Sequence, residues 1–243
     1  MTTSLPPASH RTPALSLQLH RPVLRLPGTY PAQGDTFLLA RTVRERGSVV
    51  GRDVLDVGTG GGSLAVAAAR AGARTVTAVD ISWRSVLTAR LNGRLHRAPL
   101  TVLRGDLFAP VAGRTFDVVL ANPPYVPAAT DALPRHRPGR SWDAGRDGRA
   151  VIDRICDRVG DVLVPGGRLL MVHSVLAGEA ATLERLRARG LRADVVARAD
   201  EPFGPVMTAR ADALRARGLL APGQTHEELV VVEAVRPPAG EAA

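Results

Sequence analysis

Short apolar runs rich in β-branched residues alternate with longer stretches of helical period from residue 35 onward. The short runs predict strands at 53–57, 75–79, 100–103, 117–121, 168–173, 191–198 and 227–235. The longer stretches predict helices at 36–46, 63–71, 83–96, 148–164, 178–189 and 207–217. This alternation is typical of α/β proteins, so we predict a Rossmann-like, doubly wound sheet of seven strands. Because the last run follows an additional helix, we expect the final strand to return antiparallel into the sheet.

Length and composition predict one domain. The chain has 243 residues, of which 45% are hydrophobic, and this is enough for one substantial core. Residues 1–28 are rich in proline, serine and threonine, so we predict a poorly ordered tail there. The domain then covers 29–237, with a short C-terminal tail at 238–243. The stretch 201–226 lies between the last two predicted strands, and we predict an insert there, as a lid or a partner surface.

Charge and cysteine content narrow the possible partners only slightly. All 32 basic residues are arginines, and the net charge of +9 leaves an acidic or RNA-containing partner open. Cys156 is the only cysteine and lies in a helical apolar pattern, so we interpret it as a core residue. No apolar run approaches the ~18 residues of a membrane span, and the first residues lack a secretory signal. We therefore expect a cytoplasmic protein that does not act at a membrane.

A glycine-rich turn follows the first predicted strand, in "VLDVGTGGGSLAVAAAR". Its glycines at 58, 60 and 62 allow a tight turn and a close approach of the backbone to a ligand. The dinucleotide fingerprint requires glycine at position 63, where this chain has Ser63. Asp56 stands at the end of the strand, where a carboxylate repels a pyrophosphate and favours a cationic or hydroxylated ligand. The turn therefore indicates a nucleotide-type ligand without a phosphate requirement.

Two further acids stand at the ends of the next two strands. Asp80 ends "TVTAVD", where a carboxylate binds both hydroxyls of a ribose. Asp106 follows the third strand in "LRGDLF", where it is placed to accept a hydrogen bond from an adenine amine while Leu107 packs against the ring. Each aspartate alone also fits a helix cap or a turn. Together with Asp56 and the glycine turn, which includes Gly60, they indicate S-adenosylmethionine as the cofactor.

The fourth predicted strand ends in "NPPYVP", at Asn122. In a doubly wound sheet this strand lies beside the first, so Asn122 leaves the sheet opposite the glycine turn. Pro123 and Pro124 stiffen the segment and leave its carbonyl oxygens without ladder partners, and the Asn122 side chain adds an acceptor. Two fixed acceptors are suited to orienting a planar NH2 group, and Tyr125 is placed to cover its face. The motif therefore predicts methyl transfer to an amide or aromatic amine nitrogen, although "NPP" alone also fits an ordinary exit loop.

"NPPY" in this setting resembles the HemK-like branch of class I S-adenosylmethionine-dependent methyltransferases. The flanking stretches "GDTFLL" (34–39) and "WDAGRDGRAVIDR" (142–154) resemble its single-domain, release-factor branch. The resemblance implies methylation of a glutamine side-chain amide in a release factor, a possible small activator subunit, and a cofactor site formed by Thr36, Asp56, Gly58, Asp80, Asp106, Leu107 and Asn122. It also implies that Asn122 and Pro123 hold the amide in a pocket shaped by Pro124 and Tyr125. Gly34 departs from the family, which usually has an acid there.

Other functions remain open at this point. The same acceptors fit an exocyclic base amine in RNA or DNA, or a small-molecule amine or amide, and a non-catalytic binding module is a further alternative. Trp142 and Arg146 are candidates to line the substrate entrance, although Trp142 fits equally well as a residue that fixes a loop, and we interpret His173 as a satisfied core or edge histidine. The arginine-rich helices at 178–189 and 207–217 are interpreted as having solvated faces, with a binding groove as the alternative. No spacing of histidine, cysteine and acids indicates a metal.

Overall fold

The computed structural model describes residues 23–26, 31–131, 142–238 and 240. Within them, seven strands form one sheet in the order β3-β2-β1-β4-β5-β7-β6. The strands are β1 (Asp53–Val57), β2 (Thr75–Asp80), β3 (Leu100–Arg104), β4 (Phe116–Ala121), β5 (Leu163–Ser174), β6 (Arg192–Pro202) and β7 (His226–Val235). β1 to β5 pair in parallel, and β7 is antiparallel to both β5 and β6. The predicted fold, with its final strand inserted antiparallel, is confirmed.

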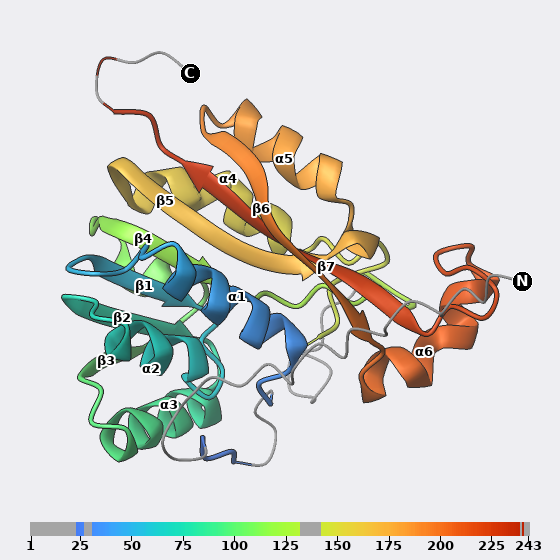
Figure 1. Ribbon diagram of the computed structural model, residues 1–243, viewed down its shortest axis with the longest axis horizontal. Coiled ribbons are helices and arrows are strands. Elements are labelled where there is room, and N and C mark those ends of the chain that lie inside the picture. Colours follow the sequence, from blue (N-terminus) through green and yellow to red (C-terminus); the bar gives the residue numbers. More distant parts are fainter. Residues whose placement is uncertain (1–22, 27–30, 132–141, 239, 241–243) are drawn as a thin grey trace, which may run out of the picture.

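Helices cover both faces of this sheet (Figure 1). They are α1 (Gly34–Glu45), α2 (Ser63–Arg70), α3 (Trp83–Leu95), α4 (Ile152–Val162), α5 (Glu179–Ala188) and α6 (Pro205–Ala216), with short 3₁₀ turns η1 (Ala109–Val111) and η3 (Val175–Ala177). α1, α2 and α3 pack together on one face, and α4 packs with α5 on the other. α6 lies past the ends of β6 and β7, at one end of the molecule.

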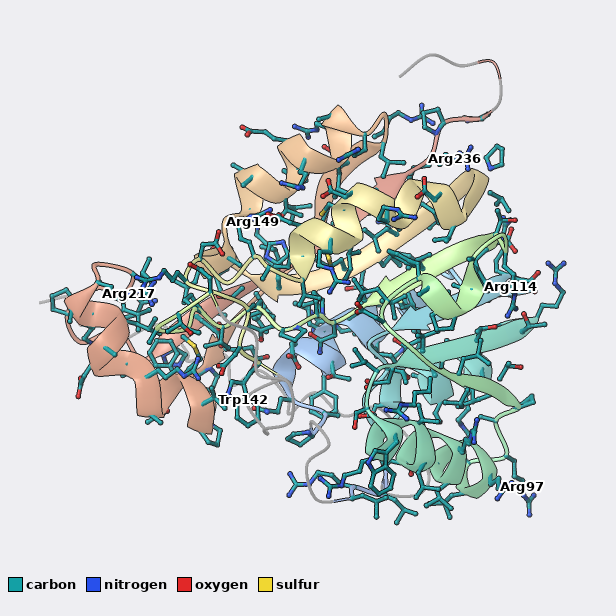
Figure 2. All side chains as sticks on the ribbon, turned by 180° about the vertical axis from the view of Figure 1, so that it is seen from behind. Arg97, Arg114, Trp142, Arg149, Arg217 and Arg236 are labelled. Carbon is teal, nitrogen blue, oxygen red and sulfur yellow. The ribbon has the colours of Figure 1, made fainter. Side chains whose placement is uncertain are left out.

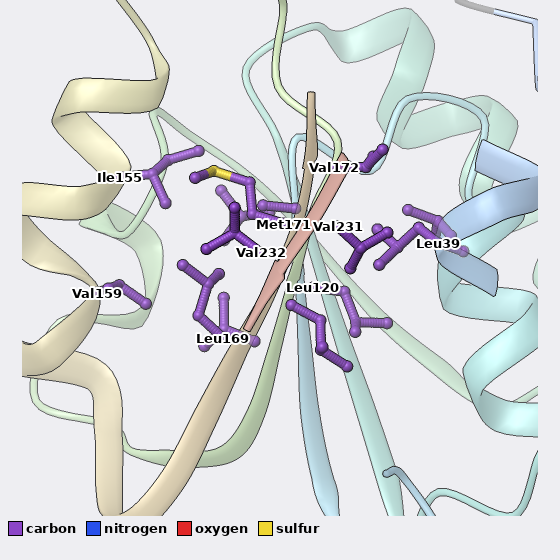
Figure 3. Packing of buried hydrophobic residues seen from close by; sticks show 14 of the residues in the cluster. Leu39, Leu120, Ile155, Val159, Leu169, Met171, Val172, Val231 and Val232 are labelled. Carbon is purple, nitrogen blue, oxygen red and sulfur yellow. The ribbon is translucent and has the colours of Figure 1, made fainter. Parts of the chain in front are cut away.

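The central strands are buried on both faces, which explains their nearly continuous apolar sequences. Figure 3 shows the alternation in β5, where Met171 points toward Ile155 of α4 and Val172 points toward Leu39 of α1. All four side chains are fully buried. The core therefore has two layers, one on each side of β4, β5 and β7, and it holds the strand ends that carry the candidate site in fixed positions.

Three element boundaries differ from the prediction by four or more residues, and one of them is the end of β6, at Pro202 instead of residue 198. The helix expected at 148–164 begins only at Ile152. Gly145 and Gly148 have φ of 81° and 77°, and Arg149 donates to the carbonyls of Ala177 and Gly178, so this stretch is an anchored loop. β5 begins five residues earlier than predicted, at Leu163.

The predicted N-terminal tail falls largely outside the described residues, except for 23–26. That short segment lies against α3, because Leu24 exchanges two hydrogen bonds with the buried side chain of Asn92, at 2.8 and 2.9 Å. Asn92 also donates to the carbonyl of Gly61 in the glycine turn, at 2.8 Å. Asn92 thus ties the segment to the turn. Among the described helices, none combines the length and apolar character needed to cross a bilayer.

Candidate functional site

The carboxyl ends of β1, β2, β3 and β4 meet at one edge of the sheet. β1 lies between β2 and β4, so the order of strands reverses between β1 and β4, as predicted. Asp56 of β1 stands opposite Leu120 of β4 in the register, two residues before Asn122. Such a reversal point is where ligands bind in open α/β sheets.

Backbone hydrogen bonds join the glycine turn after β1 to the end of β2. The amides of Gly58 and Thr59 donate to the carbonyl of Val79 at 2.9 and 3.0 Å, and the amide of Gly60 donates to Oδ2 of Asp80 at 2.9 Å. Gly58 and Gly60 have φ of 72° and 54°, and a Cβ on either would meet no described atom within 4 Å beyond its chain neighbours. The turn therefore requires glycine for its conformation and leaves open space above it.

Asp56 is almost completely buried at the end of β1, with 1% of its surface exposed. Thr59 donates to its Oδ2 at 2.6 Å, whereas its Oδ1 has no hydrogen-bond partner among the described residues. Burial raises the pKa of Asp56 to about 7, against the lowering effects of the Thr59 hydroxyl and the backbone amide of Ala65, and the charge of Asp80 adds to the rise. A buried carboxyl group with one unpaired oxygen is suited to a cationic or hydroxylated group of a ligand.

Asp106 and Leu107 follow β3 at the same edge. The amide of Gly105 donates to the carbonyl of Asp80 at 3.0 Å, which holds this segment beside β2. Asp106 is half exposed and forms an ion pair of 2.6 Å with Arg154 of α4. Leu107 has a φ of 46°, in the left-handed region that leucine rarely adopts. Strain of this kind is typical of functional sites, so Leu107 remains a candidate.

A chain of hydrogen bonds fixes the side chain of Asn122. Thr36 Oγ1 donates its only proton to Asp35 Oδ1 at 3.1 Å, so it can only accept from Asn122, whose Nδ2 lies 3.2 Å away. The NH2 group of Asn122 therefore faces Thr36, and its Oδ1 faces away. Tyr125 donates through its hydroxyl to Asp35 Oδ2 at 3.2 Å. One buried carboxylate thus holds both ends of the "NPPY" motif.

A cleft opens beside Asn122, on the side of β6 and β7. It is lined by the start of α1, residues 122–126, Trp142, the adjoining ends of β6 and β7, and the start of α6. Asn122, Pro123, Pro124 and Tyr125 all border it, whereas the residues of the glycine turn do not. Asn122 therefore stands between this cleft and the strand ends that carry the aspartates.

The sequence reasoning missed three carboxylates of this cleft, Asp35, Glu201 and Glu227. Asp35 had a signal, since it stands beside Thr36 in the "GDTFLL" stretch. Glu201 and Glu227 come from β6 and β7 and meet only through the antiparallel register of those strands. Gly34 leaves room for Glu201, because a Cβ at this position would lie 2.5 Å from Cδ of Glu201.

Two arginines of the α6 region anchor the loop that follows "NPPY". Arg210 donates to the carbonyl of Pro127 at 3.2 Å and forms an ion pair with Asp143. Arg217, labelled in Figure 2, donates to the carbonyl of Ala128 at 3.0 Å. The prediction of a solvated face is therefore wrong for Arg210, which is half buried, whereas Arg217 is exposed as predicted; a helix pattern does not show which backbone carbonyls lie beside it.

Trp142 and Arg146 have different environments. Trp142 borders the cleft, and its carbonyl accepts from the amide of Val126 at 2.9 Å, so it both lines the entrance and fixes the loop. The guanidinium of Arg146 is exposed, lies 3.5 Å from the carboxylate of Asp131 and does not border the cleft. That Arg146 lines the substrate entrance therefore stays a prediction.

His173 and Cys156 are core residues, as predicted. His173 is fully buried, and its Nδ1 lies 2.9 Å from the carbonyl of Ser174. Its Nε2 has no partner among the described residues, so the histidine is not fully satisfied, and burial lowers its pKa. Burial raises the pKa of the Cys156 thiol to about 12, which keeps it protonated.

Gly148 supports the "NPPY" motif from the second flanking stretch. A Cβ at this position would lie 2.4 Å from the carbonyl oxygen of Tyr125, and its φ is 77°. We expect Gly148→Ala to destabilise the protein by about 1–3 kcal/mol and to lower activity about tenfold, because Tyr125 must move. Gly145→Ala is the matched control, since its φ is 81° but the nearest atom is 3.4 Å away. Thermal unfolding and transfer assays of both variants test this, and equal activity losses would contradict it.

Comparison with other sequences gives matches over most of the chain. Residues 27–133 match the family described as methyltransferase small domain. A protein of Methanocaldococcus jannaschii, named as a candidate protein N5-glutamine methyltransferase, is 32% identical over 197 residues, covering 81% of this chain and 95% of that protein. A release factor glutamine methyltransferase of Gloeobacter violaceus is 40% identical over 156 residues, covering 60% of this chain and 53% of that enzyme. The chain thus spans about half the length of this bacterial relative.

Solved structures share the fold at low sequence identity. The Mtq2–Trm112 complex of E. cuniculi, described as responsible for methylation of the eRF1 termination factor, gives a TM-score of 0.60 at 23% identity, covering 86% of this chain and 99% of that one. The 16S rRNA N2 G1207 methyltransferase of T. thermophilus, in complex with AdoMet and guanosine, gives a TM-score of 0.54 at 20% identity, covering 85% and 44%. These likenesses show a common architecture.

Proposed function

The chain belongs to the HemK family of S-adenosylmethionine-dependent methyltransferases, and from that premise we propose that it methylates a glutamine side-chain amide in a protein. The observation that carries the proposal is the fixed orientation of Asn122. Its NH2 group is held by Thr36, which leaves its Oδ1 to accept a hydrogen bond from a planar NH2 group in the cleft. An amide that enters the cleft would meet this acceptor from the cleft side of Asn122. The proposed cofactor site lies on the other side of Asn122, at the ends of β1, β2 and β3.

The residues at the ends of β1, β2 and β3 fit S-adenosylmethionine. Asp56 offers an unpaired buried oxygen to a cationic group, and the glycine turn leaves open space above its backbone. Asp80 is held by the amides of Gly60 and Ser82, at 2.9 and 2.8 Å, in a position suited to ribose hydroxyls. We propose that the cofactor contacts are Thr36, Asp56, Gly58, Gly60, Asp80, Asp106, Leu107 and Asn122. When bound, this cofactor supplies an electrophilic methyl group on a sulfonium ion.

The cleft side orients the accepting nitrogen. An amide nitrogen is a weak nucleophile because its lone pair is delocalised into the carbonyl group. Asn122 Oδ1 and the carbonyl oxygen of Pro123 would each accept one amide proton, which turns the lone pair toward the cofactor side. Pro124 keeps the segment stiff, and the ring of Tyr125, held by its bond to Asp35, covers the amide face. Catalysis is then mainly positioning.

For the substrate we propose a translation release factor or a protein of similar kind, acting in the cytoplasm. The names of the bacterial relatives support this, and one relative is named as a ribosomal protein uL3 glutamine methyltransferase. We further propose that a small activator subunit takes part, which the Mtq2–Trm112 complex supports by analogy.

A labelling experiment tests the proposed acceptor. Purified protein is incubated with methyl-labelled S-adenosylmethionine and with protein, RNA and small-metabolite fractions, and the label is located after digestion. We expect label in a glutamine-containing peptide. Label found only in nucleosides or small amines would refute the proposal and favour one of the alternative acceptors.

Cofactor affinity is expected to depend on pH through Asp56. Because its pKa is about 7, Asp56 is mostly charged at pH 7.5 and mostly neutral at pH 6. We expect affinity to fall about 5- to 10-fold between these pH values as the carboxylate gains its proton. The contribution of Asp56 to the free energy of unfolding changes in the opposite sense, since the folded protein holds a proton that the unfolded chain releases. Calorimetric titration at several pH values tests this, and the cofactor affinity of Asp56→Asn should not vary with pH. If this variant showed the same pH dependence as the wild-type protein, another group would be responsible for it.

A further inference from the structure

Three carboxylates, Asp35, Glu201 and Glu227, gather at one wall of the cleft that holds Asn122. They come from α1, β6 and β7. Glu201 and Glu227 stand directly opposite each other in the antiparallel pair of β6 and β7. Like charges in this arrangement destabilise a sheet, so the fold itself gives no reason for the pairing.

Glu227 is buried on β7, with 7% of its surface exposed. Its Oε2 has no hydrogen-bond partner among the described residues, although it borders the cleft. The groups that act on its charge are the Ser174 hydroxyl of β5, Asp35 of α1 and Glu201 of β6, and both charged neighbours are negative. The pKa of Glu227 is raised to about 7, chiefly by burial; the hydrogen bond from Ser174 lowers it, and the charges of Asp35 and Glu201 raise it.

Glu201 has a similar surplus of negative neighbours. Burial raises its pKa, and the charges of Asp35 and Asp200 act in the same direction more strongly than Arg41 opposes them. Its carboxyl group fills the space beside Gly34, where a Cβ would lie 2.6 Å from Oε2. Among the described residues, Arg41 is the cation that acts on Glu201, and the negative neighbours of the two glutamates outweigh it, so these glutamates form a negative wall. The described residues form no group of three histidine, cysteine, aspartate or glutamate side chains suited to a metal ion.

Burying a carboxylate with an unpartnered oxygen, such as that of Glu227, is costly, and a cation that enters the cleft reduces this cost. We propose that the wall formed by Asp35, Glu201 and Glu227 binds a lysine or arginine side chain that lies within a residue or two of the methylated glutamine. This inference rests on the proposed function, since the same cleft holds the amide acceptors. It defines the substrate as a glutamine in a basic sequence context. The guanidinium or ammonium group pairs with Glu227 and Glu201 while the amide lies at Asn122.

Three peptides test the proposal. Each contains one glutamine, and they differ only in the residues that flank it, which are arginine, leucine or glutamate. For the wild-type protein we expect kcat/KM to be about 10-fold or more higher with arginine than with leucine, and lowest with glutamate. Glu227→Gln and Glu201→Gln should bring the arginine-to-leucine ratio toward one. Glu228→Gln is the matched control, because Glu228 lies on the same strand but is exposed and pairs with Arg198. The ratio should also increase as the pH rises through about 7, where Glu227 gains its charge.

Peptide binding measured by fluorescence polarisation without cofactor separates this inference from the proposed function. Methylation of all three peptides at equal efficiency would overturn the inference and leave the proposed function intact. In another outcome no peptide is methylated, but the arginine peptide binds more tightly than the others and Glu227→Gln removes this preference. This outcome would support the negative wall and count against glutamine as the methyl acceptor. An arginine preference that persists in both glutamine variants would overturn the inference, provided that thermal melting shows them folded. Tighter binding of free agmatine than of the arginine peptide would also overturn it.

Discussion

Asn122→Ala is expected to lower the rate of methyl transfer by about 100- to 1,000-fold, the loss that follows removal of one fixed hydrogen-bonding group at a reacting centre. The side chain borders the cleft, and its amide is oriented by Thr36 so that Oδ1 is left to accept. Alanine removes this acceptor without disturbing Asp56 or Asp80. The affinity for S-adenosylmethionine should therefore stay within about threefold of the wild-type value. Single-turnover assays and calorimetric titration measure the two quantities.

Variants of Thr36 show whether orientation is the cause. Thr36→Ser keeps the hydroxyl that donates to Asp35 and accepts from Asn122, so it should retain transfer. Thr36→Val removes the hydroxyl and allows the amide of Asn122 to turn, which should cost about tenfold in rate. If Asn122→Ala lowered cofactor affinity as much as the transfer rate, the assignment of Asn122 to the substrate amide, and of Asp56 and Asp80 to the cofactor, would be wrong.

Asp80→Ala should lower cofactor affinity instead of the rate of transfer. Both carboxylate oxygens of Asp80 are held by backbone amides, that of Gly60 in the glycine turn and that of Ser82 before α3. Alanine would remove the proposed ribose contact and release the turn together. We expect the affinity for S-adenosylmethionine to fall about 100-fold, since hydrogen bonds to a charged group contribute about 1.5–3 kcal/mol each. The kcat at saturating cofactor should change only a few fold.

Asp53→Ala provides a control at the opposite end of β1. Asp53 forms an ion pair with Arg74 at 2.5 Å, far from the carboxyl edge of the sheet, so its loss should leave cofactor affinity unchanged. Calorimetry on both variants, with thermal melting to check their folding, tests this. A loss of kcat with unchanged affinity in Asp80→Ala would contradict the assignment of Asp80 to the cofactor.

The sequence predicted the cofactor half of the molecule well because local pattern determines it. β1 has the predicted bounds, and the residues at the ends of parallel strands share one edge of the sheet by topology alone. Asp56, Asp80 and Asp106 could therefore be placed together without coordinates. The helix expected from residue 148 failed because glycines in left-handed conformations and the anchored Arg149 override its helical period.

The cleft half could be predicted only in part. "NPPY" identified one wall, since rigid prolines after a strand are visible in the sequence. Glu201 and Glu227 are 26 positions apart along the chain and meet through strand register, which the pattern of β6 does not define. A one-residue shift in that pairing would turn one of them away. The contacts of Arg210 and Arg217 depend on a loop whose path no periodicity describes.

The insertion of β7 between β5 and β6 has a consequence for biosynthesis. β6 leaves the ribosome before β7 but has no other neighbour in the sheet, so it must wait for the last strand to emerge. The strands β1 to β4 pair among themselves and are available for assembly earlier, since domains gain structure as synthesis proceeds from the N-terminus. A nascent chain would therefore acquire its nucleoside-type site before its acceptor cleft, and the pairing that completes the cleft would be among the last events of folding.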